Sequence, residues 1–293
     1  MDASIIIRTY NEARWLPAVL EAIANQTLAR ERFEVLVVDS GSTDGTREIA
    51  KAHGCRLVSI SKEEFTFGRS LNLGCAVAEG RALVFLSGHC IPATHDWLER
   101  LIAPLGERGI AYVYGRQLPH ERSKYSEGQL FRKYFPERSA LPQEGFFCNN
   151  GNAALLREVW QDNLFNEALT GLEDMDLAKR LLAQGWKVGY IAEAPVYHIH
   201  EESWLRVRQR YEREAIALQA IMPEIHVDFI DFLRYFVSGV LFDWASALRD
   251  RCFLRFAGEI VMFRLMQYWG TWRGNNDHRK LSRRRKEAYF YPR

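Results

Sequence analysis

The stretch FEVLVVDSGSTDG, residues 33–45, decides the fold class: an apolar run ends abruptly in a polar, turn-rich cluster. The same pattern opens the chain, where SIIIRT (4–9) precedes YNE, and it recurs where ALVFL (82–86) precedes SGHC. Apolar residues at helical spacing separate these runs, so each run is predicted to be a buried strand of a parallel sheet covered by helices on both faces. In such sheets ligands bind at the carboxyl ends of the strands, where these polar clusters lie.

The composition is that of a globular protein. The chain has 293 residues, of which 47% are hydrophobic and 26% charged, which excludes a disordered chain, a collagen-like fibre and a disulfide-rich miniprotein. The five cysteines are odd in number and form no CxxC pair, so we expect a reducing, cytoplasmic compartment. No apolar run approaches the length of about 20 residues that a membrane span needs, and the start of the chain lacks the pattern of a signal peptide.

Three regions differ in their sequence pattern. Residues 1–105 alternate strand and helix signals, residues 106–225 mix turns with strong helices, and residues 226–293 are predicted to form an amphipathic helical arm with a basic tail. The last 21 residues carry eight Arg or Lys against two acids, in a chain whose net charge is only +2. Such an arm suits an anionic membrane surface, here the inner face of the cell membrane. The alternative is a helical hairpin packed on the rest of the chain. No nucleic-acid partner is expected, because the tail offers few stacking residues and no known binding module.

Several motifs occur in a fixed order, whereas P-loop, GxGxxG, GxSxG and HExxH signatures are missing from the sequence. The motifs are IIIRTYNE (5–12), VVDSGSTDGT (37–46), EEFTFGRSLNLG (63–74), VFLSGHCIP (84–92) and YGRQLP (114–119). Together they resemble the family 2 glycosyltransferases of the GT-A fold, and are most similar to the rhamnosyltransferase-like members. The resemblance runs through most of the first 220 residues.

This resemblance implies an α/β fold of the GT-A nucleotide-diphospho-sugar transferase type, with a mostly parallel central sheet flanked by helices and a C-terminal helical arm. It implies an inverting glycosyltransferase that moves a sugar from a nucleotide diphosphate donor (dTDP or UDP) to a hydroxyl of a surface-glycan or lipid-linked acceptor. The rhamnosyltransferase-like motifs favour L-rhamnose as the sugar, although Phe67 stands where those relatives often have His. Two alternatives are a catalytically inactive relative that binds nucleotide sugars and a sugar nucleotidyltransferase.

The donor nucleotide is expected at the strand ends. A pyrimidine base presents an N3–H donor, for which a carboxylate at a strand end is a suitable acceptor, and the resemblance gives Asp39 this role. The alternative for Asp39 is a turn or helix cap, and Asn11 and Glu12 could equally cap the next helix. The full set of expected donor-binding residues is Thr9, Tyr10, Glu12, Asp39, Arg69, Asn72 and Ser87.

The metal site departs from the family pattern. Relatives carry an Asp that binds a divalent ion, within a DxD or TQD motif, whereas this chain has Ser87-Gly88-His89-Cys90 without any carboxylate. Losing that charge removes on the order of 4 kcal/mol of attraction at 4 Å and an effective dielectric of 20. Imidazole favours Mn²⁺ and similar ions over Mg²⁺, so His89 is expected to hold Mn²⁺, unless the protein works without a metal and His89 contacts phosphate or is merely structural.

A second metal ligand is expected near residue 198. The segment YHIH (197–200) closes a predicted strand, and alternate residues of a strand face the same way, so His198 and His200 could share one cavity. The resemblance favours His198 as a metal or diphosphate contact, and the alternative is a structural histidine.

The catalytic base is expected in GLEDMDL (171–177), which resembles the E-D-x-D-L motif of the family. The resemblance assigns the base to Asp174, with Glu173 contacting acceptor or donor; a carboxylate base contributes typically 10²–10⁴-fold to the rate. The alternative is a pair of acids that complement the dipole of a helix N-terminus. Just upstream, the turn NNGN matches a loop that lines the sugar and acceptor side in the family, through Asn150, Gly151 and Asn152. Its alternative is ordinary turn chemistry.

Overall fold

The computed structural model describes residues 1–276 and 288–291. These residues form two compact units. The first unit comprises residues 1–120, 135–168 and 173–199, and the second comprises residues 121–134, 169–172 and the described residues from 200 onward. The division at residues 105 and 225 inferred from the sequence stays a prediction, and most of the basic tail lies outside the described residues.

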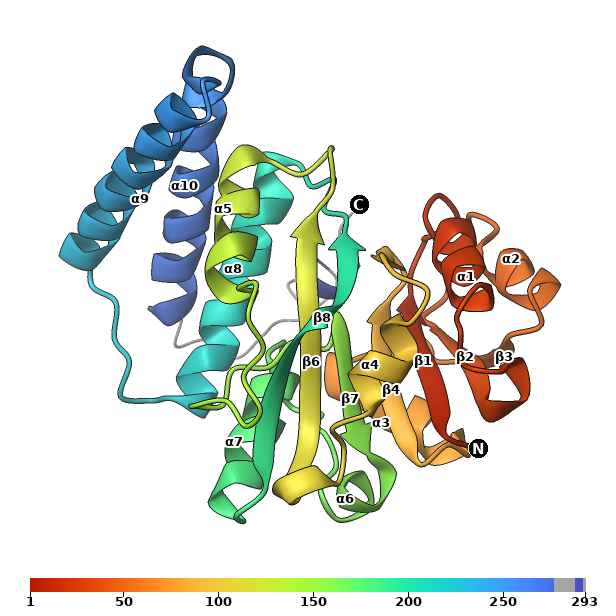
Figure 1. The fold of residues 1–293 in the computed structure, drawn as a ribbon. Coiled ribbons are helices and arrows are strands. Elements are labelled where there is room, and N and C mark those ends of the chain that lie inside the picture. Colours follow the sequence, from red (N-terminus) through yellow and green to blue (C-terminus); the bar gives the residue numbers. More distant parts are fainter. Residues whose placement is uncertain (277–287, 292–293) are drawn as a thin grey trace. The chain divides into compact units, whose positions relative to one another are not determined.

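An eight-stranded sheet forms the centre of the first unit, in the order β3-β2-β1-β4-β7-β6-β8-β5 (Figure 1). The parallel half predicted from the sequence is confirmed, because β1 pairs in parallel with β2 and β4, and β2 with β3. The other half is mixed: β7 runs antiparallel to β4 and β6, β6 is parallel to β8, and β5 is antiparallel to β8. The strand bounds are β1 Ala3–Thr9, β2 Phe33–Asp39, β3 Arg56–Ser59, β4 Ala82–Ser87, β5 Cys90–Pro92, β6 Ile110–Pro119, β7 Asn152–Leu156 and β8 Lys187–His198.

Apolar side chains bury both faces of the strands in the parallel half. Ile5, Ile6 and Ile7 are fully buried in β1, and their neighbours in β2 and β4 are buried in the same way. Such strands need helices on both faces, which explains why apolar runs alternate with amphipathic segments in this part of the chain. The α-helices of the first unit are α1 Leu16–Ala24, α2 Thr46–Ala52, α3 Phe67–Val77, α4 Trp97–Ile102, α6 Arg157–Asp162 and α7 Glu173–Ala183.

Four helices form most of the second unit: α5 Tyr125–Tyr134, α8 Trp204–Ile221, α9 Phe229–Arg249 and α10 Phe253–Asn275. The predicted helical arm is therefore present, as α9 and α10. Helix α10 lies against α8 at Gly270 and Gly274, where an added Cβ would come within 2.3 Å and 2.1 Å of backbone oxygens of α8. Only glycine permits this close approach. Helix α9 is tied to α10 by the fully buried Asp243, whose carboxylate accepts from Nε and Nη2 of Arg264 at 2.7 and 2.8 Å.

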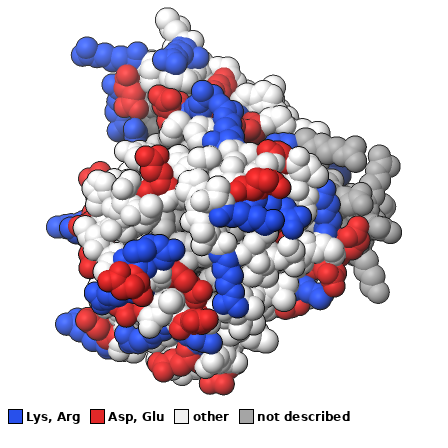
Figure 2. Space-filling model, turned by 90° about the vertical axis from the view of Figure 1, so that its right-hand side faces the viewer, with Lys and Arg blue, Asp and Glu red and all other residues white. Residues whose placement is uncertain are grey.

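Charges of both signs are mixed on one face of the molecule. Figure 2 shows a face on which Lys and Arg lie among Asp and Glu without a continuous stripe of one sign. Among the described helices, none combines the length and apolar character required to cross a lipid bilayer.

Candidate active site

The carboxyl ends of β1 and β2 bring Thr9 and Asp39 together. The two residues are partners in the parallel register, and Thr9 Oγ1 donates to Asp39 Oδ1 over 3.1 Å. Asp39 is 1% exposed, and its other oxygen accepts from the backbone N–H groups of Gly41 and Ser42, both at 3.0 Å. The carboxylate thus closes the turn after β2, which is the turn role left open by the sequence. Its predicted contact with a pyrimidine base stays a prediction.

The loop after β1 is tied to the loop after β2. Asn11 has a φ of 56°, a left-handed conformation that Asn tolerates, and its side-chain oxygen accepts from Thr43 N–H at 2.9 Å. Neither Asn11 nor Glu12 is the N-cap of α1, since that position belongs to Trp15. Tyr10 lies at this edge too, and its hydroxyl accepts from Lys62 Nζ at 2.8 Å.

Arg69 and Asn72 lie on α3, but their surroundings differ. Arg69 is partly exposed and pairs with Glu64 over 3.3 Å. Asn72 is buried: its Nδ2 donates to Phe165 O and Glu167, and its Oδ1 accepts from Trp160 Nε1 and Phe165 N. Asn72 therefore anchors the segment around residue 165, and a donor contact for Arg69 or Asn72 stays a prediction.

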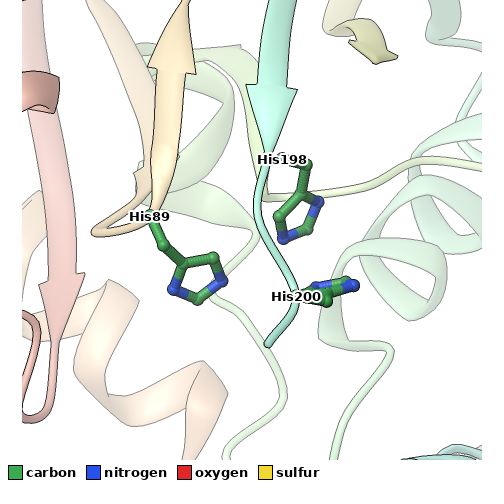
Figure 3. A group of neighbouring side chains, drawn as sticks. All are labelled: His89, His198 and His200. Atoms are coloured by element: carbon green, nitrogen blue, oxygen red, sulfur yellow. The ribbon is translucent and has the colours of Figure 1, made fainter. Parts of the chain in front are cut away.

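His89 and His198 lie side by side because β5 pairs with the end of β8. His89 immediately precedes β5, His198 is the last residue of β8, and Cys90 is the register partner of His198. The two rings are stacked, with centroids 5.2 Å apart and planes 22° apart (Figure 3). The structure thus brings together the two histidines that the sequence singled out. Ser87 ends β4 two residues before His89.

Both rings have their Nδ1 atoms bonded to oxygen. His89 Nδ1 lies 2.8 Å from Glu12 Oε1, and His198 Nδ1 lies 2.6 Å from Gln117 Oε1. The amide of Gln117 is oriented by its own Nε2, which donates to Asn149 Oδ1. An oxygen acceptor at Nδ1 requires the proton there, so in the neutral ring Nε2 carries the lone pair. This oxygen–imidazole arrangement is the one that orients histidine ligands in metal sites, so the two residues fit a divalent ion.

His200, also labelled in Figure 3, belongs to the second unit. The strand alternation expected for this residue stops short of it, because β8 ends at His198, and a cavity shared by His198 and His200 stays a prediction. His200 Nδ1 is 2.7 Å from the buried Glu127, which also accepts from Arg210 at 2.7 Å, and Arg210 bonds to Glu202 as well. Burial alone would raise the pKa of Glu127, but the charges of His200 and Arg210 lower it to about 2. Although Glu127, His200 and Glu202 could hold a cation, Arg210 already supplies a positive charge to both carboxylates.

Asp174 is a buried carboxylate in the first turn of α7. It is 7% exposed, its Oδ2 accepts from the backbone N–H of Asn150 at 2.8 Å, and its Oδ1 accepts from that of Met175 at 2.8 Å. Burial, followed by the negative charge of Glu173, raises the pKa of Asp174 to about 7, against the opposing effects of those N–H groups and of Arg8. A carboxylate with such a pKa exchanges protons near neutral pH, as a general base must.

The turn before β7 supports this carboxylate. Asn150 is 2% exposed; its Oδ1 accepts from the Tyr112 hydroxyl, and its Nδ2 lies 3.4 Å from Glu173 Oε1. Gly151 is closely approached by neighbouring side chains, since an added Cβ would lie 2.9 Å from Asn149 Oδ1. Asn152 is fully buried. Its Oδ1 accepts from Trp97 Nε1, and its Nδ2 donates to the carbonyls of Arg116 and Ala194. The acceptor-side role of Asn150, Gly151 and Asn152 stays a prediction.

Two residues that the sequence did not single out complete the site. Arg8 on β1 pairs with Glu173 over 3.0 Å, and Gln117 on β6 holds His198. Arg8 lies in the motif IIIRTYNE and Gln117 in YGRQLP, so the sequence identified their motifs. It did not indicate which residues they contact.

The sheet order and flanking helices define an α/β fold of the GT-A glycosyltransferase type. The mannosyltransferase PcManGT from Pyrobaculum calidifontis, solved with GDP-Man and Mn²⁺, matches with a TM-score of 0.60 at 19% identity, over 93% of this chain and 72% of that one. TarS 1–349 from S. aureus, solved with UDP-GlcNAc, matches with a TM-score of 0.54 at 15% identity, over 97% and 95% of the two chains.

The chain belongs to glycosyltransferase family 2. Residues 4–164 match the family described as Glycosyl transferase family 2. The O-antigen chain rhamnosyltransferase RfbN of Salmonella typhimurium is 31% identical over 242 residues, which cover 78% of this chain and 76% of the relative. The protein is therefore a glycosyltransferase, and this confirms the resemblance inferred from the motifs.

Proposed function

We propose that the protein is an inverting glycosyltransferase in which Asp174 is the catalytic base. The observation that carries this proposal is the buried Asp174 carboxylate at the start of α7, with its pKa raised to about 7. In the proposed step Asp174 takes the proton of an acceptor hydroxyl while the hydroxyl oxygen bonds to C1 of the sugar. The bond between C1 and the diphosphate breaks on the opposite face, and the nucleoside diphosphate leaves with the bonding electrons.

The donor is proposed to be a nucleotide diphosphate sugar at the carboxyl ends of β1, β2 and β4, contacted by Thr9, Tyr10, Asp39 and Ser87. L-rhamnose on dTDP is the favoured donor, because RfbN is named a rhamnosyltransferase and the two chains align over most of their length. UDP stays the alternative carrier, since TarS is solved with UDP-GlcNAc. The proposed acceptor is a growing surface glycan, by likeness to the same O-antigen enzyme.

His89 and His198 are proposed to hold a divalent ion, with Mn²⁺ favoured over Mg²⁺. The support is the pair of Nδ1 bonds to Glu12 and Gln117, which present both rings through Nε2. Such an ion would neutralise negative charge on the diphosphate of the donor. A mechanism without metal stays the alternative, with His89 contacting the diphosphate directly.

An anionic lipid surface is the proposed partner of α9, at the cytoplasmic face of the membrane. Leu233, Val237 and Leu241 are among the exposed apolar residues of this helix, and its exposed charged residues are both basic, Arg234 and Arg249. Of the two acids in this helix, Asp231 belongs to the capping box and Asp243 forms the buried ion pair with Arg264. A second copy on the same face would place arginine against arginine, so charge favours lipid. The cytoplasmic location rests on five cysteines without a disulfide.

The proposed base is tested by Asp174→Asn. We expect kcat to fall by roughly 10²–10⁴ while donor affinity is kept, because the amide retains the shape but takes no proton. The measurement is the release of nucleoside diphosphate from dTDP-L-rhamnose and UDP sugars with acceptor present, alongside donor binding by calorimetry. Near-normal turnover would remove Asp174 as the base. A wild type that binds these donors but transfers no sugar would favour the inactive relative.

A further inference from the structure

We propose that Arg8 is a positioning residue of the catalytic centre: it holds Glu173 beside Asp174 and balances the charge of the two carboxylates. The inference rests on the proposed role of Asp174 as the base. Arg8 itself is not expected to touch either substrate.

The position of Arg8 follows from the sheet. It is the penultimate residue of β1, and its register partners are Val38 in β2 and Ser87 in β4. Its guanidinium carbon lies 5.0 Å from the centre of the Phe67 ring, and its Nη1 is 3.0 Å from Glu173 Oε1. The side chains of this pair are only 16% and 5% exposed, so the interaction is weakly screened by water.

The ion pair between Arg8 and Glu173 offsets the repulsion between two adjacent acids at the start of α7. Glu173 and Asp174 are adjacent, buried acids, and two like charges so close oppose each other's ionisation. The dipole of a helix N-terminus helps an acid by no more than about 2 kcal/mol. Among the described residues, the cation in contact with Glu173 is Arg8. Without it, Glu173 would be a buried charge with no counter-charge, which is strongly unfavourable.

In the part of the chain that the structure describes, few other titratable groups face Asp174. Tyr112 from β6 and Cys148 from the loop before β7 both lie close enough to interact with it, but burial raises the pKa of each well above its ordinary value. Both are therefore neutral through the range of an enzyme assay. The protonation of Asp174 is left to depend on burial, on Glu173, on two backbone N–H groups and on Arg8, whose positive charge lowers its pKa.

The test is the pH dependence of kcat/KM, which reports the essential base of the unliganded enzyme. In this profile the acid limb is the pH range over which activity falls as the base becomes protonated. Removing the cation in Arg8→Met should move the acid limb to higher pH by about one unit, as expected for loss of an opposite charge nearby. Activity should recover at high pH. The matched control Arg8→Lys keeps the charge, so its acid limb should stay within a few tenths of a unit of the wild type. A merely structural role for Arg8 would lower the rate equally at all pH values.

A variant of the acidic partner of Arg8 gives an independent test of the proposal. Glu173→Gln removes the charge that raises the pKa of Asp174, so its acid limb should move downward. The double variant Arg8→Met/Glu173→Gln should return the limb toward the wild-type position. An unchanged limb in Arg8→Met, or equal shifts in Arg8→Met and Arg8→Lys, would overturn the proposal. If Arg8→Met does not fold, by its melting curve, an acid limb in Glu173→Gln that fails to move downward overturns it instead.

The proposed base is checked separately in the same assay. The residual activity of Asp174→Asn should lack the acid limb. A limb that persists in this variant contradicts the base assignment, whatever the Arg8 series shows.

Discussion

In the proposed metal site, the neutral His89 stands where relatives carry a charged ligand, and the residues around it would partly compensate. Its ring is held by Glu12 at 2.8 Å, so a carboxylate is retained next to the ligand rather than within the ligand set. Such a carboxylate raises the basicity of the imidazole and fixes its direction. The proposed site would therefore offer ligands that suit the later first-row ions.

Metal preference should follow the identity of residue 89. We expect higher activity with Mn²⁺ than with Mg²⁺, and His89→Asp should shift the preference toward Mg²⁺ because an oxygen ligand replaces nitrogen. His89→Ala should raise the metal concentration at half-maximal rate. His53→Asp, at an exposed histidine of α2, is the control and should leave both values unchanged. Full wild-type activity in excess chelator would contradict the metal site and leave His89 as a diphosphate contact.

The sequence singled out individual candidate residues of the site, but not the residues that they contact. Asp174 and Glu173 stand in one short motif and begin one helix, so local order was enough to single them out. The contact between Arg8 and Glu173 spans 165 positions of the chain, and that between Gln117 and His198 spans 81. No local pattern encodes such pairs, because they depend on which strands become neighbours.

At the level of elements, the sequence predicted the parallel strands and the helices between them, but not the strands β5, β6 and β7 of the mixed half. The apolar runs of β1, β2 and β4 and the periodicity of α1 are matched closely. Helix α3 starts at Phe67, because Thr66 caps it by accepting from Arg69 N–H at 3.0 Å. The antiparallel placement of β7 was not predicted, since an alternating or apolar run carries no information on strand direction.

The hairpin of α9 and α10 should depend on its buried ion pair. Removing one partner in Asp243→Ala leaves the charge of Arg264 buried, which typically costs about 3–5 kcal/mol. The double variant Asp243→Leu/Arg264→Met should recover most of this loss, because apolar residues of similar size tolerate burial. Urea unfolding followed by circular dichroism measures both. The exposed pair of Asp96 and Arg100 is the control, and Asp96→Ala should cost no more than about 1 kcal/mol. Equal losses at the two pairs would contradict the expectation.

On the scale of the whole molecule, the proposed membrane partner makes the protein's location depend on α9. Leu241→Glu/Phe242→Glu should weaken binding to phosphatidylserine vesicles by at least about tenfold, because each exposed side chain contributes on the order of 1.5–3 kcal/mol when buried in lipid. Binding of the wild type should also weaken in high salt, through Arg234 and Arg249. Leu164→Glu is the control, since this leucine of the first unit is 52% exposed, against 57% for Leu241. Equal binding to neutral and anionic vesicles at all salt concentrations would contradict the electrostatic part.

The burial of Asp174 has a consequence for the stability of the whole chain. Its pKa is raised from 3.8 to about 7 on folding, so the folded state binds this proton more tightly than the unfolded state. Below pH 3.8 both states are protonated and nothing is lost. As the pH rises toward 7 the unfolded state ionises first, and the free energy of unfolding falls by up to about 4 kcal/mol.

With Asp174 as the proposed base, this loss of stability would be largest in the pH range where the base is active. Asp174→Asn should gain stability relative to the wild type as the pH rises from 4 to 8, although it gives up one backbone hydrogen bond at every pH. Urea titrations of both proteins at the two pH values measure this difference. A difference that does not change with pH would mean that Asp174 is ionised as readily in the folded chain as in the unfolded one.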